Sequence, residues 1–395
     1  MIIVCEPQCW DFEHSRVNAS LVHTVLLAYP GSPLLFLGEP GHSACVRELL
    51  EAQAPGEVTR VQWRDLAIPP RQASGSRRLR CEWNVIRQTL RAASQAGASL
   101  VLFTSATEIG FFLLKVQLAG SRVSVPVLAV MHGVLATIVP GAPRKRLASL
   151  RGMRLVFRLP QPRQLRYVAL GESILRSLRE IHPAAARHTV AIEIPFSWTE
   201  NALPGDSPLP PTPMRFGYFG VSGGRGKGFD RFVRLADEIR GEFPEARFMM
   251  VGHLSTGTDR ARFGTAQEDY PGAPLTQDEY ARRARQVTYA VSVTDAYVYR
   301  VGASTSFLDA LSSIKPGIYL RNPYLEECFR TMGDIGYLCD TLDDVRACMR
   351  SVLAEFPASR YARQCRNIFL MRRIFEPATI CTRLHTIVEE VRRAL

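Results

Sequence analysis

The chain has 395 residues, of which 46% are hydrophobic, a net charge of +12 and nine cysteines. This length predicts about two domains, and the apolar fraction excludes a disordered chain. An odd number of cysteines without C-x-x-C spacing indicates reduced thiols, and excludes a disulfide scaffold and a cysteine metal centre. Because no apolar run nears about 18 residues and the N-terminus lacks a secretory signal, we expect a cytoplasmic protein.

In the first half, apolar strands alternate with amphipathic helices. The expected strands are 2–5, 34–37, 58–63, 100–103, 127–130, 167–170 and 189–194. The expected helices are 19–28, 45–52, 82–93, 108–118 and 172–181. Such alternation predicts an α/β domain with a parallel sheet, which we place at 1–200. Five prolines between 201 and 213 then indicate an interdomain linker.

The second half repeats the pattern and predicts a second Rossmann-like domain at 214–375. Its expected strands are 215–219, 247–251, 288–293, 317–320 and 336–339. Its expected helices are 278–285, 306–313, 325–332 and 343–355, with one more after 228. A helical segment from 362 to the C-terminus completes the chain, and its last part, 376–395, is set apart from the second domain.

The most informative motif is a glycine-rich turn between the strands at 215–219 and 247–251. It contains Gly220, Gly223 and Gly224, then Arg225 and Lys227, directly before a helix. Backbone N–H groups, a helix N-terminus and two cations predict phosphate binding. A Walker P-loop has the pattern G-x-x-x-x-G-K-[ST]; here Val221 occupies the position of its first glycine and Gly228 that of its Ser/Thr, which excludes this motif. The dinucleotide-binding pattern G-x-G-x-x-G does not fit the spacing of the glycines either.

Three other places carry candidate residues. His132 follows the strand at 127–130, and the loop expected at 6–18 after the first strand contains Asp11, Glu13, His14, Arg16 and Asn18. Carboxyl ends of parallel strands are where such sheets bind ligands, and these side chains offer bases and polar contacts. The third place is the run before the helix at 306–313 together with the first residues of that helix, and it contains Arg300, Gly302, Ser304, Thr305, Ser306 and Asp309. There Ser304 or Thr305 serves either as an anion ligand or as a plain helix N-cap.

Positive charge is concentrated between residues 144 and 166, which hold eight basic and no acidic side chains. Together with interleaved apolar residues, this segment predicts contact with an anionic membrane surface or a pyrophosphate-linked lipid acceptor. An ordinary solvated face is the alternative. We expect no nucleic-acid partner, because no stacking aromatics, helix-turn-helix or zinc pattern accompanies the charge.

Residues 160–355 resemble the retaining family 4 glycosyltransferases of GT-B fold. The similarity lies in the strand, Gly-Arg turn and Lys-Gly at 214–228, in the strand ends Val-Gly at 251–252, and in the 167–195, 275–285 and 294–316 segments. The resemblance implies two Rossmann-like domains facing each other across a cleft, with the C-terminal helix returning to the first domain. It implies sugar transfer from a nucleotide diphosphate donor to a hydroxyl acceptor with retention, as in bacterial surface-polysaccharide synthesis on lipid-linked glycans.

The resemblance also implies roles for the candidates. His132, Arg225 and Lys227 would be catalytic, with the two cations on the leaving diphosphate. The donor would be held by the following residues: Gly220, Gly223, Gly224, Arg300, Gly302, Ser304, Thr305, Ser306 and Asp309. Asp11, Glu13, His14, Arg16 and Asn18 would lie on the acceptor side. No cofactor or metal is expected, since basic side chains and helix N-termini serve the leaving group in this fold and the chain has no Asp-x-Asp.

The chain departs from the family pattern at two points. Val301 stands at the first acidic position of the family's E-x7-E motif, and the loop after the first strand lacks the usual Gly-Gly pair. The first departure leaves open a catalytically inactive GT-B protein that only binds. A sugar-nucleotide epimerase of similar fold is another alternative, although the several carboxylates and histidines it needs are not found.

Overall fold

The computed structural model describes residues 1–69, 73, 75–121, 123–140, 152–198, 203, 213–223, 226–258, 260, 263 and 268–395. The chain divides into two compact units, which are described separately. Unit 1 consists of Met1–Ser197, Val301–Ala303 and Ile374–Leu395, and unit 2 of Trp198–Arg300 and Ser304–Arg373. In the described part of the chain, no helix is both long and apolar enough to cross a membrane.

Unit 1 is built on a parallel sheet of seven described strands in the order β3-β2-β1-β4-β5-β6-β7. The strands are β1 (Ile2–Cys5), β2 (Leu34–Gly38), β3 (Val61–Asp65), β4 (Leu100–Phe103), β5 (Val127–Val130), β6 (Leu165–Leu170) and β7 (Thr189–Ile192). All residues of β1, β2, β4 and β5 are buried. These strands form because short apolar runs can be covered by helices on both faces of a parallel sheet.

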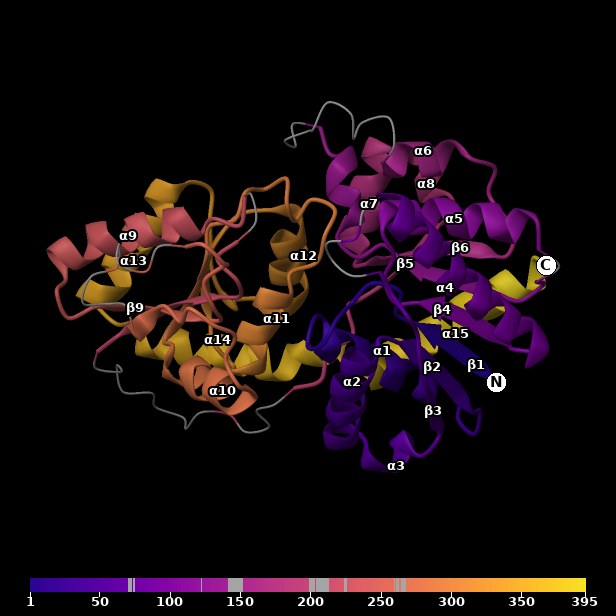
Figure 1. Cartoon of the computed structure of the whole chain (residues 1–395). Coiled ribbons are helices and arrows are strands. Elements are labelled where there is room, and N and C mark those ends of the chain that lie inside the picture. Colours follow the sequence, from indigo (N-terminus) through magenta and orange to yellow (C-terminus); the bar gives the residue numbers. More distant parts are fainter. Residues whose placement is uncertain are drawn as a thin grey trace. The chain divides into compact units, whose positions relative to one another are not determined.

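The helices of unit 1 cover this sheet. They are α1 (Ser15–Ala28), α2 (Pro40–Gln53), α3 (Pro55–Val58), α4 (Gly75–Gln95), α5 (Glu108–Ala119), α6 (Met153–Arg158), α7 (Glu172–Ile181), α8 (Pro183–Ala186), α15 (Pro377–Arg393) and the 3₁₀ helix η1 (Val134–Ile138). The C-terminal helix α15 packs on α1, as Figure 1 shows with α15 in yellow. Arg392 at its end donates to the carbonyl of Ser99 at 3.1 Å. The expected return of the last helix to the first domain is therefore confirmed.

Unit 2 is built on a second parallel sheet, with five described strands in the order β12-β11-β10-β8-β9. The strands are β8 (Arg215–Phe219), β9 (Arg247–Val251), β10 (Tyr289–Ser292), β11 (Gly317–Leu320) and β12 (Gly336–Cys339). The helices are α9 (Phe229–Glu242), α10 (Gln277–Gln286), α11 (Thr305–Ser312), α12 (Pro323–Met332), α13 (Leu342–Ala354) and α14 (Ala358–Met371), and the 3₁₀ helix η4 (Arg372–Phe375) follows. Both units thus have the predicted Rossmann-like architecture.

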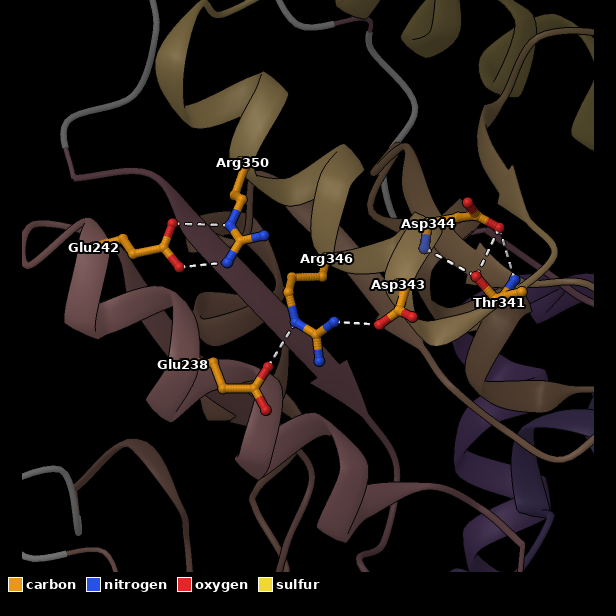
Figure 2. A network of polar contacts seen from close by, with 7 residues as sticks. All are labelled: Glu238, Glu242, Thr341, Asp343, Asp344, Arg346 and Arg350. Atoms are coloured by element: carbon orange, nitrogen blue, oxygen red, sulfur yellow. Dashed lines mark hydrogen bonds and ion pairs between the residues drawn. The ribbon is translucent and has the colours of Figure 1, made fainter.

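Exposed ion pairs join α9 to its neighbour α13 (Figure 2). Arg346 Nε lies 2.7 Å from a carboxylate oxygen of Glu238, and Arg350 Nε lies 2.8 Å from one of Glu242. Pairs this exposed contribute little stability individually. The glycine-rich turn leads directly into α9.

Several predicted elements differ from the structure. The helices expected at 45–52 and 82–93 begin earlier, at Pro40 and at Gly75. The strand expected at 58–63 is Val61–Asp65, because Pro55 starts the one-turn helix α3 that ends at Val58. The helix expected from 19 begins at Ser15, so the loop expected at 6–18 is shorter than predicted. The C-terminal helical segment begins at Ala358 and is interrupted by η4 before Pro377 opens α15. These boundaries are set by turns and prolines, so the spacing of apolar residues alone does not predict them.

Candidate functional site

The glycine-rich turn of unit 2 lies where strand order reverses. The strand β8 has β9 on one side, but the next strand in the chain, β10, pairs on its other side. Ligands of open α/β sheets bind in the crevice at the carboxyl ends of the two strands that flank such a reversal. The turn at 220–228 follows β8 and the segment at 293–304 follows β10, so both loops border this crevice.

Close backbone approaches explain the glycines of the turn. Gly228 has a φ of +81° and precedes α9, and a Cβ there would meet the carbonyl oxygen of Val293 at 2.2 Å. Gly220 has a φ of +105°, and a Cβ would meet Ser306 Oγ at 2.8 Å. The glycines therefore let the turn lie directly against the loop after β10 and the start of α11. Gly224 and Arg225 lie outside the described residues.

A pocket opens at this place. Its described lining comes from β8 and the turn, from β10 and the loop after it, and from α11, β11 and α12: Tyr218, Phe219, Val221, Lys227, Ala290, Val291, Ser292, Thr294, Tyr299, Ser304, Ser306, Phe307, Tyr319 and Leu325. Of the predicted donor-side residues, Lys227, Ser304 and Ser306 belong to it. Arg300, Gly302, Thr305 and Asp309 are not part of this lining, although they lie in the same segment of the chain.

Ser304 acts as the N-cap of α11, since its hydroxyl accepts from the N–H of Phe307 at 3.2 Å. The N-cap alternative is thus realised by Ser304, while Thr305 is the first residue of the helix. Ser306 is the second residue of α11, and its hydroxyl lies next to Gly220. The N-termini of α9 and α11 consequently both adjoin the crevice, each with the partial positive charge of a helix start.

Lys227 lines the pocket although part of its side chain is exposed. Desolvation by the surrounding protein lowers the pKa of its ammonium group. The backbone of Lys227 is also fixed, because its carbonyl accepts from Thr294 Oγ1 at 3.3 Å. A phosphate in the pocket would meet a lysine and two helix N-termini, the usual protein groups for an anion.

Unit 1 has its own strand-order reversal, between β1 and β4, and Glu6 lies there directly after β1. The buried carboxylate of Glu6 accepts from the hydroxyls of Ser105 and Thr104 after β4, from Asn18, and from the backbone N–H of Gln8 and Cys9. Burial acts to raise the pKa of Glu6, but these hydrogen bonds outweigh it and the pKa is lowered. Sequence reasoning missed Glu6, although a carboxylate immediately after a buried strand was a usable signal.

The structure brings His14 and His132 together. Their ring centroids are 4.2 Å apart, with His132 after β5 and His14 at the N-cap position of α1. Burial and the neighbouring His14 lower the pKa of His132 to about 3, so its imidazole is neutral at neutral pH. A neutral imidazole offers one donor and one acceptor to a sugar hydroxyl or a phosphate.

The other four acceptor-side candidates differ from one another in their contacts and in their burial. Glu13 accepts from the N–H of Trp10 at 3.1 Å, which closes the turn before α1. Arg16 and Asn18 lie on α1 and not in the expected loop, because the helix starts at Ser15. The guanidinium of Arg16 stacks over the ring of Phe196 at 5.4 Å, while Asn18 is buried against Glu6. Asp11 is exposed at the turn.

The basic segment 144–166 is described only from residue 152 onward. Its helix α6 is anchored by the buried Lys115, whose ammonium donates to the carbonyls of Val156 and Leu159 at 2.8 and 2.9 Å. Burial lowers the pKa of Lys115 to about 8. Arg154 donates to the carbonyl of Ile138 at 3.2 Å.

Comparison with known proteins gives likenesses of structure only. No protein-family model matches the sequence. No curated protein sequence matches it either. Among solved structures, HepE (Alr3699) of Anabaena, in complex with UDP and glucose, aligns with a TM-score of 0.65 and 9% identity, covering 98% of this chain and 99% of HepE.

Two glycosyltransferases align as completely. One, from Rickettsia africae, has a TM-score of 0.61 and 13% identity over 99% of this chain and 98% of its own. WaaG, a glycosyltransferase involved in lipopolysaccharide biosynthesis, has a TM-score of 0.61 and 10% identity over 98% of this chain and 99% of its own. At such identities a likeness establishes the fold, and it confirms the expectation drawn from the sequence: the chain has the GT-B fold of these glycosyltransferases.

Proposed function

We propose that this protein is a glycosyltransferase that moves a sugar from a nucleotide diphosphate donor to a hydroxyl acceptor. The observation that carries the proposal is the pocket at the β8–β10 reversal, where the glycine turn, Lys227 and the N-terminus of α11 meet. These groups suit the diphosphate that leaves during transfer, because they stabilise negative charge as it develops. HepE, whose structure holds UDP and glucose, has the same fold. A uridine nucleotide is therefore the first donor to test.

The reaction breaks the bond between the anomeric carbon and the donor phosphate oxygen, and forms one to the acceptor oxygen. In the retaining course that we propose, the acceptor proton passes to the departing phosphate on the same face of the sugar. No protein nucleophile is needed for this course. Lys227 and Arg225 hold the diphosphate, and neutral His132 orients a sugar hydroxyl or phosphate by hydrogen bonding. Metal independence remains a prediction from the resemblance to family 4 enzymes.

The donor site is tested by thermal stabilisation of the purified protein with UDP, GDP, dTDP, ADP and CMP, without metal. We expect one nucleoside diphosphate to raise the melting temperature. Lys227→Ala should weaken its binding at least tenfold, since one charge-assisted hydrogen bond contributes about 1.5–3 kcal/mol. The matched control is Lys315→Ala, because Lys315 donates to the carbonyl of Arg285 and does not line the pocket.

The outcome separates the alternatives. Nucleotide binding with release of UDP from UDP-glucose supports a transferase, and conversion into another sugar nucleotide would instead identify an epimerase. Binding without any turnover would favour the inactive GT-B protein suggested by Val301 at the first acidic position. No binding of any nucleoside diphosphate would refute the proposed donor site.

For the acceptor we propose a lipid-linked glycan at an anionic membrane surface, met by the basic segment 144–166. The charge of this segment supports the proposal, and WaaG, of the same fold, is involved in lipopolysaccharide biosynthesis. Co-sedimentation with vesicles tests it. We expect the protein to bind vesicles that contain phosphatidylglycerol and not to bind vesicles of phosphatidylcholine alone. Binding to the anionic vesicles should fall when Arg158 and Arg163 are replaced by Gln, and also when the salt concentration is raised. Equal binding to both vesicle types would contradict it.

A further inference from the structure

The turn between β1 and α1 contains two strained residues. Asp11 has a φ of 48° and His14 a φ of 50°, both in the left-handed region that residues with a side chain rarely adopt. The two residues, and Phe12 between them, are exposed, so burial of the turn itself does not compensate the strain. Strain of this kind persists only where surrounding contacts enforce it, and it gathers at functional sites.

The first residues of α2 enforce this conformation. Glu39 is the N-cap of α2, and its carboxylate accepts from the N–H of His42 at 2.7 Å and from that of Asp11 at 3.4 Å. His42 Nδ1 lies 2.8 Å from the carbonyl oxygen of Asp11. A Cβ at Gly41 would lie 2.6 Å from Asp11 Oδ1, so glycine at this position leaves room for the Asp11 side chain.

The hydrogen-bond partners of His42 indicate which ring nitrogen carries the hydrogen. A carbonyl oxygen only accepts, so Nδ1 carries the proton and donates to Asp11. Nε2 lies 2.9 Å from the amide nitrogen of Asn18 and accepts from it, and the same amide nitrogen donates to Glu6 at 3.0 Å. His42 is fully buried. One continuous chain of hydrogen bonds thus runs from Glu6 through Asn18 and His42 to the strained peptide of Asp11.

We propose that His42 is a positioning residue for the reaction, which fixes the turn Trp10–His14 so that His14 stays against His132. The inference rests on the proposed function, because it treats His132 as a residue of the reacting site. A turn held before substrate arrives loses less entropy when the reacting groups are aligned.

The direct test uses His42→Phe, which fills similar space and removes both hydrogen bonds. NMR titration of the imidazole carbons reports on the turn without any substrate. In the wild type, burial is the main cause that lowers the pKa of His132, and the neighbouring His14 adds to it. In His42→Phe the released turn should move His14 away, so the pKa of His132 should rise. An unchanged His132 titration would overturn the inference.

Turnover gives the second readout, with UDP-glucose and UDP as the probes. His42→Phe should lower the kcat for UDP release from UDP-glucose at least tenfold, while the Kd for UDP stays within twofold. His42→Asn retains a donor toward the carbonyl of Asp11 and should restore most of the rate. Ser43→Ala is the matched control, because Ser43 is the buried neighbour on α2 and its hydroxyl makes no hydrogen bond.

The outcomes separate this inference from the proposed function. An unchanged kcat in His42→Phe would refute the positioning role, as would equal losses of kcat and UDP affinity. If the wild type neither binds nor turns over nucleotide sugars, the proposed function fails. The imidazole titration then still decides whether His42 holds the turn against His132.

Discussion

Glu6→Gln is the most informative single change in unit 1, because an amide cannot satisfy the donors that the carboxylate satisfies. Five groups donate to the two oxygens of Glu6, and Asn18 and Thr104 share one of them. An amide nitrogen at that position meets the N–H of Asn18 and leaves at least one buried donor without an acceptor, which costs about 1–3 kcal/mol. The other bonds lose their charge assistance, so we expect a total loss of about 3–5 kcal/mol.

The assay is urea unfolding followed by tryptophan fluorescence. Three of the four tryptophans, Trp10, Trp63 and Trp83, lie in unit 1, so the signal follows mainly that unit. Glu48→Gln is the control, since Glu48 is exposed on α2. An unchanged midpoint for Glu6→Gln at pH 7 would refute the reasoning.

The pH dependence of the difference follows from the lowered pKa of Glu6. A carboxylate whose pKa is lower in the folded state stabilises the fold fully above its unfolded pKa of about 4.3. The contribution is lost as the pH falls through the folded value. The gap between wild type and Glu6→Gln should therefore be constant from pH 5 to 7 and shrink below about pH 4.

Three further predictions concern other parts of the fold. Gly228→Ala should lower the free energy of unfolding by about 2–4 kcal/mol, because the site combines a positive φ with a backbone clash. Gly241→Ala, in the last turn of α9 where an added Cβ meets no other atom, should raise it by about 0.5–1 kcal/mol in the same urea assay. His132→Asn should reduce the loss of stability that the wild type shows in thermal melts as the pH falls from about 6.5 to 4. In this range the unfolded wild-type chain binds a proton at His132, whereas the folded state, in which the pKa of His132 is about 3, does not. A slope equal to that of the wild type would contradict this. Lys115→Met leaves two carbonyls at the end of α6 without their donor, so it should lower the free energy of unfolding by about 1–3 kcal/mol and speed trypsin cleavage within α6. An unaltered rate of cleavage would refute the anchoring role of Lys115.

Much of the fold could be predicted because its strands are short apolar runs between glycines, prolines and polar turns. The bounds of β8, β9, β11 and β12 agree with prediction residue by residue. Helix starts were harder to predict. The N-cap of α1 is His14, which adopts a left-handed conformation and makes no side-chain cap hydrogen bond, so the sequence contains no capping signal for the helix start at Ser15.

In the candidate site, too, residues close together in the sequence could be predicted and contacts between distant residues could not. The glycine turn could be recognised because its chemistry is local: Gly220, Lys227 and Gly228 lie within nine residues. The network in unit 1 could not, because Glu6 meets Thr104 and Ser105, which are 98 and 99 residues away. His42 likewise reaches Asn18, 24 residues earlier, and nothing in the sequence near His42 indicates that partner.

The composition of unit 1 from distant segments has a consequence for synthesis on the ribosome. The helix α15 buries Ile380, Leu384, Ile387, Val388 and Val391 and packs on α1, yet it is translated after the whole of unit 2. Unit 2 lies entirely between these partners in the chain, so it can fold while unit 1 still waits with an uncovered apolar face on α1. During synthesis this face of α1 therefore stays exposed until α15 has left the ribosomal tunnel, and exposed apolar surface of this kind favours aggregation. A chain that stops before α15 would therefore contain all of unit 2 and a first unit whose α1 lacks its apolar partner.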